Sequence, residues 1–365
     1  MKRKIIDWAR WSMGLSNLAI CGPAKSYSIA IIIPAYNEEL SIAKTIESIR
    51  NQTVQVGEII VVDDCSTDGT GRVAKESGAI VVRTPENQGT KAMAQNYVLS
   101  MVTAELVVTI DADTTLHPQA IEKTLRYFND EKTASVCGFV IPQKIETLWE
   151  RGRFIEYMYG IILNKSAQNH IGAVMVSSGC FSIFRTDILN KFGGFKQRTM
   201  AEDMDLTWEM TLAGHHIYCA QDSYCYPLDP PSADIFSKQV KRWYASFFQN
   251  VSIYKGKFGK KRRLGMIVYV SLLDAVVVSP LICVAGFFAA RHNLLQALAF
   301  GLLLDLGFVM FTCSFKAYKL GMLRKVIFSV PCYAVIRPVN FAIFWKCLWN
   351  EWIVGNRLST WEKGH

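Results

Sequence analysis

Short apolar runs alternate with amphipathic stretches over residues 28–142. The pattern predicts strands at 28–36, 58–62, 79–83 and 105–110, and helices at 42–49, 68–77, 89–101 and 118–128. Continuous apolar strands that alternate with helices indicate a parallel sheet covered on both faces. The predicted fold class is therefore α/β. The pattern leaves the topology of residues 143–233 open.

The pattern changes after residue 233. Residues 234–254 have the apolar stripe of an amphipathic helix, and a basic cluster follows at 255–263. Apolar runs then cover 264–290, 294–315 and 326–349, the last interrupted by Pro331, Arg337 and Pro338. A helix needs about 20 residues to cross hydrocarbon, so the first two runs are predicted to span a membrane, and the third to span or re-enter.

Basic residues flank these apolar runs, at 255–263 and 316–325. Cytoplasmic loops carry an excess of Lys and Arg, so we expect a multi-pass cell-membrane protein whose α/β domain is cytoplasmic. The net charge of +9 is then explained by a lipid bilayer, and no nucleic acid is expected as a partner. Asp274 and Asp305 lie inside the apolar runs, where charges mark either a helix–helix contact or a water-filled path.

The expected organisation has five parts, with no span before the α/β domain. They are an N-terminal interfacial segment (1–27, with a disordered tail as the alternative), the α/β domain (28–233), an amphipathic interfacial helix with its basic cluster (234–263), a membrane region of two to three spans (264–349) and a C-terminal tail (350–365). Ten scattered cysteines show no metal-binding spacing, which indicates reduced thiols.

Two predicted strands end in paired carboxylates, at Asp63 and Asp64 and at Asp111 and Asp113. Ligands of open α/β sheets bind at the carboxyl ends of the strands. Carboxylates spaced as in Asp111-Ala112-Asp113 can hold Mg²⁺ or Mn²⁺ with substrate phosphates, although solvated turns share this spacing. The stretch after Asp64 also suits a helix cap, which explains Ser66 or Asp68 but not two adjacent carboxylates.

Two later segments also carry candidate chemistry. A carboxylate of Glu202-Asp203 can act as a general base, or the pair can simply begin a helix. Gln239, Arg242 and Trp243 share one helix face by their spacing. Arg binds phosphate and Trp stacks on sugar rings, but a membrane-surface helix has the same composition.

Other activities fit less well. Gly69, Gly71 and Ala74 match a dinucleotide-binding fingerprint, but Gly69 lies seven positions after Val62 instead of directly after the strand. A Walker A sequence is absent. A transporter would require more spans than the apolar runs provide.

Taken together, the motifs resemble those of the family 2 glycosyltransferases, especially the processive synthases of cellulose, chitin, hyaluronan and poly-N-acetylglucosamine. The matching segments occur in the family's order over residues 28–245: Ile33-Pro34-Ala35-Tyr36-Asn37-Glu38, Val62 to Asp68, Asn87-x-Gly89-x-Lys91-Ala92, Asp111-Ala112-Asp113, Ser178-Gly179-Cys180, Ala201-Glu202-Asp203 and Gln239-x-x-Arg242-Trp243. The resemblance implies a GT-A fold, with a nucleotide-binding half and an acceptor half around one sheet.

The resemblance also implies a role for each matched residue. The nucleotide-sugar site would comprise Pro34, Ala35, Tyr36, Glu38, Asp63, Asp64, Lys91, Asp111, Gln239 and Arg242. Asp113, with Asp111, would bind the metal on the diphosphate. Asp203 matches the general base, with Glu202 beside it. The acceptor would contact Gly179, Cys180 and Trp243.

The implied function is inverting, metal-dependent transfer from a UDP-sugar to the hydroxyl of a growing polysaccharide, with UDP-N-acetylglucosamine as the first choice of donor. One alternative is transfer of a single sugar to a lipid-linked or short glycan acceptor. Another is an inactive membrane subunit that keeps the fold. Since two or three spans are few for an export channel, a partner subunit is a further expectation.

Overall fold

The computed structural model describes residues 25–259, 262–278 and 295–359, together with residues 284, 288 and 291. The predicted interfacial segment lies almost wholly outside these residues, and so does most of the apolar run after residue 278. Eight cysteines in the described part are free thiols, in agreement with the prediction of reduced cysteines.

The strands and helices follow the predicted alternation as far as residue 129. The strands are β1 (Ile29–Ala35), β2 (Ile59–Asp63), β3 (Ile80–Arg83), β4 (Leu106–Ile110), β5 (Thr115–Leu116), β6 (Thr133–Val140), β7 (Phe181–Arg185) and β8 (His216–Tyr226). The helices of this part are α2 (Ile42–Arg50), α3 (Thr70–Glu76), α4 (Lys91–Leu99), α5 (Ala120–Leu125), α6 (Leu148–Tyr159), α7 (Ser166–Asn169), α8 (Thr186–Lys191) and α9 (Glu202–Ala213). The α/β class is confirmed.

Within the described residues the strands form one sheet in the order β3-β2-β1-β4-β7-β6-β8-β5. The first four strands in this order run parallel, as predicted. The rest of the sheet is mixed, since β7 runs antiparallel between β4 and β6, and β5 pairs antiparallel with β8. The long apolar strand β6 was not predicted at all, although all of its residues are buried.

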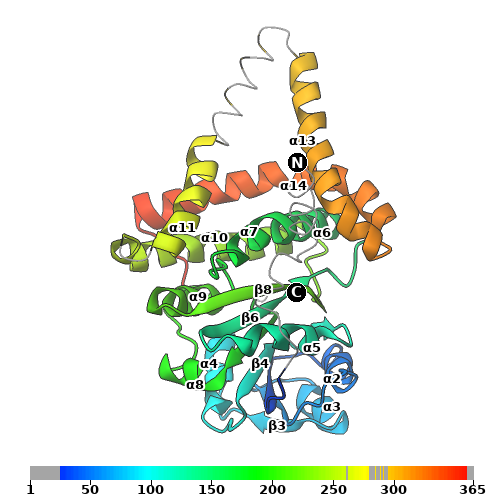
Figure 1. The fold of residues 1–365 in the computed structure, drawn as a ribbon, viewed down its shortest axis with the longest axis vertical. Helices are drawn as coiled ribbons and strands as arrows, with labels where there is room; N and C mark the ends of the chain where they lie inside the picture. Colours follow the sequence, from blue (N-terminus) through cyan, green and yellow to red (C-terminus); the bar gives the residue numbers. More distant parts are fainter. Residues whose placement is uncertain are drawn as a thin grey trace.

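Burial explains the parallel half of the sheet. The side chains of β1 and β2 are almost all buried, as expected for strands covered on both faces. Helix α2 contributes Ile42, Ile46 and Ile49, which recur at helical spacing and are fully buried. In Figure 1, α2, α3 and α5 lie to one side of the strands, and α4 and α8 lie to the other.

The C-terminal helices form a separate layer on the α/β domain. They are α10 (Ala233–Tyr254), α11 (Arg262–Leu273), α13 (Leu295–Lys319) and α14 (Leu323–Leu348). Figure 1 shows α14 running across the domain, whereas α11 and α13 rise away from it. Helix α14 approaches α6 closely, since a Cβ on Gly152 would lie 2.7 Å from the Ile336 side chain. Both prolines of the third apolar run lie inside α14, which continues through them because neighbouring helices support it.

Two of the described helices are long and apolar enough to cross a membrane, at Gly301–Lys319 and Leu323–Val354. The second of these covers the run whose topology the sequence left open. Between the two helices, Arg337 forms an ion pair with Asp305. This contact accounts for the charge at Asp305 as a helix–helix contact, one of the two alternatives that the sequence allowed.

Candidate functional site

The carboxyl ends of three neighbouring strands, β2, β1 and β4, bring the predicted acidic residues to one edge of the sheet. Asp63 ends β2 and pairs in register with Ala35 at the end of β1. Its carboxylate is buried, lies 2.5 Å from the Arg83 guanidinium and accepts a hydrogen bond from the backbone N–H of Ser66. Asp63 therefore has fixed partners, and Arg83 supplies a cation that the sequence reasoning missed.

Asp64 is also held by hydrogen bonds. Its carboxylate accepts from the Thr84 hydroxyl at 2.9 Å and from the backbone N–H of Gln88 at 2.8 Å. The backbone N–H of Asp64 donates to the carbonyl oxygen of Ala35. These contacts join the ends of β1 and β2 to the loop that precedes α4.

The loops after β1 and β2 contain the positive backbone φ angles outside glycine in the described part of the chain. They are 56° at Asn37 and 58° at Cys65. Side chains other than glycine adopt this conformation at a cost, and such residues cluster at ligand sites. The first loop also contains Tyr36, which is exposed, and Glu38, whose carboxylate accepts a hydrogen bond from the Ser41 hydroxyl.

Lys91 connects the carboxyl end of β4 to the segment around Gly179. Its ammonium group pairs with Asp111 and donates a hydrogen bond to the carbonyl oxygen of Gly179 at 2.7 Å. Burial, the largest single influence, lowers the pKa of Lys91. The carboxylates of Asp111, Glu202 and Asp203 outweigh it, so this pKa is raised and the ammonium stays charged.

Glu202 and Asp203 begin α9, directly beside Lys91. The Asp203 carboxylate accepts a hydrogen bond from the backbone N–H of Gly179 at 2.8 Å. A Cβ at position 179 would lie 3.1 Å from the Asp203 carboxylate and 3.2 Å from the Lys91 nitrogen, so a larger residue there would have to displace these two groups slightly. The pair therefore begins a helix and also borders the site, so the two alternatives from the sequence are compatible.

The pKa of Glu202 is raised by burial and by the negative charge of Asp203. The positive charges of Lys91 and Arg242 act in the opposite direction on this pKa. Arg242 on α10 is thus close enough to Glu202 to affect its titration. One charged network runs from Asp111 through Lys91 and the carboxylate pair to Arg242.

Asp113 lies in the turn after β4 and is buried, with an exposed fraction of 7%. Its backbone carbonyl accepts a hydrogen bond from the Gln143 side chain at 2.8 Å. The described residues contain no cluster of three or more metal-ligating side chains. Two carboxylates suit Mg²⁺ or Mn²⁺ when substrate phosphates supply further ligands, so Asp111 and Asp113 fit such an ion together with its substrate.

Gln239 and Trp243 contact a buried arginine that the sequence reasoning missed. Arg153 on α6 donates to the Gln239 side-chain oxygen at 3.0 Å, and its guanidinium lies 4.6 Å from the centre of the Trp243 ring. The side chain of Arg153 is only 1% exposed and forms ion pairs with Glu156 at 2.5 Å and with Asp229 at 3.8 Å. Gln239 and Trp243 are therefore tied to α6.

Asp229 lies at the far side of this arginine. Burial is the main reason why its pKa is raised to about 7. The Tyr157 hydroxyl donates to one carboxylate oxygen at 3.1 Å. The other oxygen has no hydrogen-bond partner among the described residues. We define the Arg153 cluster as Arg153, Glu156, Tyr157 and Asp229.

Cys180 follows Gly179, and its carbonyl oxygen accepts a hydrogen bond from the backbone N–H of Asp111 at 3.2 Å. The preceding residue, Ser178, accepts a hydrogen bond from Lys165 at 2.8 Å. Lys165 ends a short π-helical segment, and such segments are frequent near functional sites. No sequence motif indicated Lys165.

Comparisons with known proteins agree with this geometry. A model of the family described as glycosyl transferase family 2 matches residues 30–193. Residues 30–193 form a family 2 glycosyltransferase domain. The resemblance inferred from the motifs is confirmed for this domain.

The relatives of this glycosyltransferase domain include polysaccharide synthases. The hyaluronan synthase of Streptococcus pyogenes is 29% identical over 267 residues, which are 67% of this chain and 63% of that protein. The poly-beta-1,6-N-acetyl-D-glucosamine synthase of Staphylococcus aureus (strain COL) is 27% identical over 220 residues, which are 59% of this chain and 53% of that protein. The chain thus spans 63% of the length of the matched hyaluronan synthases.

A solved structure shows the same fold over most of the chain. It is the mannosyltransferase PcManGT of Pyrobaculum calidifontis, in complex with GDP-Man and Mn²⁺. The TM-score is 0.62 at 20% identity, over 91% of this chain and 96% of that one. Together with the sheet order, this supports a GT-A-like α/β domain.

Proposed function

We propose that the chain is an inverting glycosyltransferase that transfers a sugar from a UDP-sugar to the hydroxyl of a growing polysaccharide. The observation that carries this proposal is the network around Lys91. Its ammonium bridges Asp111 at the nucleotide edge and the Gly179 backbone, whose N–H binds Asp203. A candidate base, a cation and the nucleotide edge of the sheet thus lie within one set of contacts.

The proposed roles follow from this arrangement. Asp203 accepts the proton of the acceptor hydroxyl as that oxygen attacks the anomeric carbon from the face opposite the diphosphate, which inverts the configuration. Lys91 and Arg242 supply positive charge near the departing diphosphate. Glu202 is the second candidate for the base, since a raised pKa makes a carboxylate a stronger proton acceptor.

The metal belongs to the same proposal. Asp113 and Asp111 would hold Mg²⁺ or Mn²⁺, which neutralises charge on the diphosphate when bound. Asp113→Asn should therefore remove most activity, and so should excess EDTA. Restored activity after Mg²⁺ or Mn²⁺ is added back to the wild type, but not to the variant, is the expected result. Full activity in EDTA contradicts metal dependence.

UDP-N-acetylglucosamine is the proposed donor. The relatives named as hyaluronan and poly-N-acetylglucosamine synthases make polymers that contain this sugar or are built from it, which supports the choice. The purified chain should be incubated with a panel of UDP-sugars, with UDP release and product mass as readouts. Long products from UDP-N-acetylglucosamine are expected. Release of UDP only with other donors would overturn the donor assignment.

Transfer of a single sugar to a lipid-linked or short glycan is the second candidate. The placement of Trp243 favours it, because the Arg153 guanidinium covers one face of the ring that would otherwise stack on an acceptor sugar. Product mass separates the two candidates. A series of lengths indicates polymerisation, whereas one added sugar indicates single transfer.

Membrane attachment is part of the proposal. Its support is the pair of long apolar helices, together with exposed apolar side chains on α11 and α13 such as Tyr269, Val270 and Phe311. We expect the chain to stay with membranes after a high-salt wash, since salt screens only the basic clusters. Recovery in the salt-washed supernatant would contradict attachment through apolar helices.

A further inference from the structure

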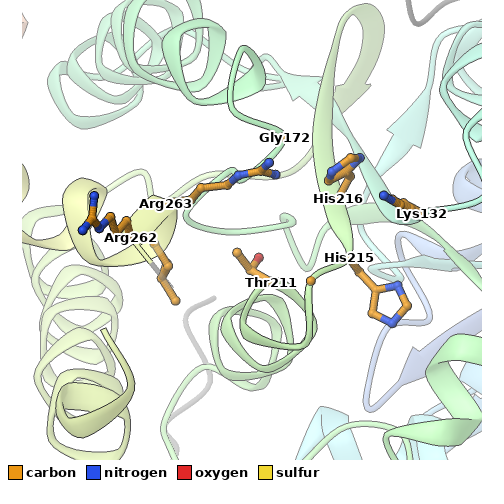
Figure 2. Close-up of a pocket in the computed structure, with 9 residues that line it drawn as sticks. Lys132, Gly172, Thr211, His215, His216, Arg262 and Arg263 are labelled. Carbon is orange, nitrogen blue, oxygen red and sulfur yellow. The ribbon is translucent and has the colours of Figure 1, made fainter. Parts of the chain in front are cut away.

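A pocket with a basic lining lies away from the network around Lys91. Its volume is about 380 Å³, within the range of roughly 300–1,000 Å³ typical of small-ligand sites. It is lined by Lys132, Gly172, Thr211, Gly214, His215, His216, Arg262, Arg263 and Leu264. Figure 2 shows Arg263 reaching in from one side toward His216 and Lys132, with Thr211 below Arg263 in this view. We call this the basic pocket.

The sheet order places the basic pocket at the edge opposite the nucleotide site. Strand β7 is antiparallel to both β4 and β6, and β8 is parallel to β6, so β4, β6 and β8 point the same way. Lys132 directly precedes β6, and His216 begins β8, so both mark amino ends of strands. Asp111 follows the carboxyl end of β4. The basic pocket therefore cannot be an extension of the nucleotide site.

Helix α9 also shows that the basic pocket is separate from the network around Lys91. Asp203 lies in its first turn, and Thr211 lies in its last turn, about 12 Å further along the axis. One helix thus contributes the candidate base to one site and a hydroxyl to the other.

The hydroxyl group of Thr211 also indicates a ligand in the basic pocket, for a reason that does not depend on charge. Its side chain is 6% exposed, and its hydroxyl oxygen has no hydrogen-bond partner among the described residues. A buried hydroxyl without a partner costs free energy, and a ligand that accepts its hydrogen bond removes that cost. The chain therefore presents a donor to the interior of the basic pocket.

The cations of the basic pocket are only partly compensated. No ion pair of Lys132, Arg262 or Arg263 is found within the described part of the chain. The Asp130 carboxylate pairs with His216 at 2.8 Å and interacts electrostatically with Lys132, and Asp187 interacts with His215. The first turn of α11 carries Arg262 and Arg263 and no acidic residue, although positive side chains are disfavoured at a helix amino end. An anion bound here would offset all these charges.

We infer that the basic pocket binds the phosphate headgroup of an anionic phospholipid. The lipid source is favoured because Arg263 is followed on α11 by Met266, Tyr269 and Val270, which are exposed and apolar. Basic pockets at the cytoplasmic ends of membrane helices bind such headgroups. This inference rests on the proposed membrane attachment, but its test does not need a bilayer.

The test is a calorimetric titration of the purified full chain in neutral detergent with dihexanoyl phosphatidylglycerol. Dihexanoyl phosphatidylcholine and inorganic phosphate are the comparison ligands. Saturable binding of the phosphatidylglycerol, with both comparisons at least tenfold weaker, is expected. Equal affinity for phosphatidylcholine would overturn recognition of the anionic headgroup. Equal affinity for inorganic phosphate would overturn the lipid assignment.

Variants separate the basic pocket from general surface charge. Arg263→Gln and Lys132→Gln should each weaken phosphatidylglycerol binding about fivefold. Lys255→Gln is the matched control, since Lys255 is exposed in the same basic cluster but does not line the pocket, and it should change affinity less than twofold. An equal loss in the Lys255 variant would overturn the proposal.

Thr211→Val tests the pocket without changing surface charge, and the measured quantity is again the affinity for phosphatidylglycerol. The substitution keeps the shape and the net charge and removes only the hydroxyl, so it should weaken binding about fivefold without lowering thermal stability. Unchanged affinity in this variant would show that the hydroxyl plays no part. Transfer activity and membrane attachment are measured in separate experiments. If either of those predictions is contradicted, the titration still shows whether the pocket binds phosphatidylglycerol.

Discussion

The acidic edge of the sheet and the Arg153 cluster are built in opposite ways. At the acidic edge, Asp63, Asp64 and Asp111 find partners about 20 residues away in the sequence, namely Arg83, Thr84 and Lys91. Each of these contacts lies within one or two strand–helix units. The sheet register pairs Asp63 with Arg83, and the start of α4 brings Lys91 to Asp111.

Arg153 instead contacts residues that are far away in the chain. Gln239 lies 86 residues later and Asp229 lies 76 residues later, and its partner Glu156 accepts a hydrogen bond from Asn340, 184 residues away. These contacts exist only because α6, α10 and α14 pack on one another. Local motifs thus identify the acidic edge of the sheet, whereas the Arg153 cluster depends on the whole tertiary structure.

The largest effect is expected for Asp203→Asn, whose carboxylate lies beside Lys91 and Gly179. If Asp203 is the base, turnover should fall by a factor on the order of 10²–10⁴ with donor affinity nearly unchanged. Turnover is measured by UDP release and affinity by calorimetry. The Asn side chain keeps the shape of Asp but accepts no proton. A large loss of turnover with unchanged donor affinity would therefore identify Asp203 as the base.

Two neighbouring variants serve as controls for Asp203. Arg242→Ala should weaken UDP affinity, because it removes a charge near the diphosphate. Glu202→Gln should be milder than Asp203→Asn. If Glu202→Gln instead loses turnover while Asp203→Asn retains it, then Glu202 is the base, in line with its raised pKa.

The second test addresses the Arg153 cluster. Arg153→Met should lower the stability of the folded chain by roughly 3–5 kcal/mol, since it leaves the buried Asp229 and the partly exposed Glu156 without their cation. Thermal unfolding in detergent measures this effect. Arg151→Met on the same helix is the matched control, and it should cost less than about 1 kcal/mol because Arg151 is partly exposed. If both variants lowered the unfolding temperature equally, substitution anywhere on α6 would be destabilising, and the Arg153 cluster would have no specific role.

The smallest expected effect is a pH dependence from Asp229. Its folded pKa of about 7 lies above the ordinary value near 3.9, so the folded state binds an extra proton between these limits. Its contribution to stability therefore falls as the pH rises from about 4 to about 7 and is constant above that range. The raised pKa of Glu202 adds a slope of the same sign.

Asp229→Asn should reduce the fall in stability with rising pH. The part that Glu202 contributes should remain. The measurement is the unfolding midpoint between pH 5 and pH 8, compared with that of wild type. Asp187→Asn on α8 is the control, since Asp187 is exposed and its loss should leave the slope unchanged. A slope that stays the same in Asp229→Asn would mean that Asp229 is not the titrating group.

The sequence predicted the parallel strands and their helices because each is encoded locally. Apolar runs such as residues 58–62 give buried strands, and isoleucines at helical spacing give α2. The strands β5 to β8 were not predicted, since an apolar run by itself does not distinguish a strand from a buried helix. The antiparallel direction of β7 was not predictable because strand pairing is a long-range property.

The sequence by itself determined the α/β class, the acidic strand ends and the family of the glycosyltransferase domain. These follow from periodicity and from motifs that each occupy a few consecutive residues. Only the tertiary structure decided that Arg153 holds Gln239 and Trp243, that Arg337 pairs with Asp305, and that Lys132 and Arg263 line one pocket. Such contacts join residues 32 to 131 positions apart. Nothing in a local pattern specifies them, since they arise when helices and strands pack and buried charges must find partners.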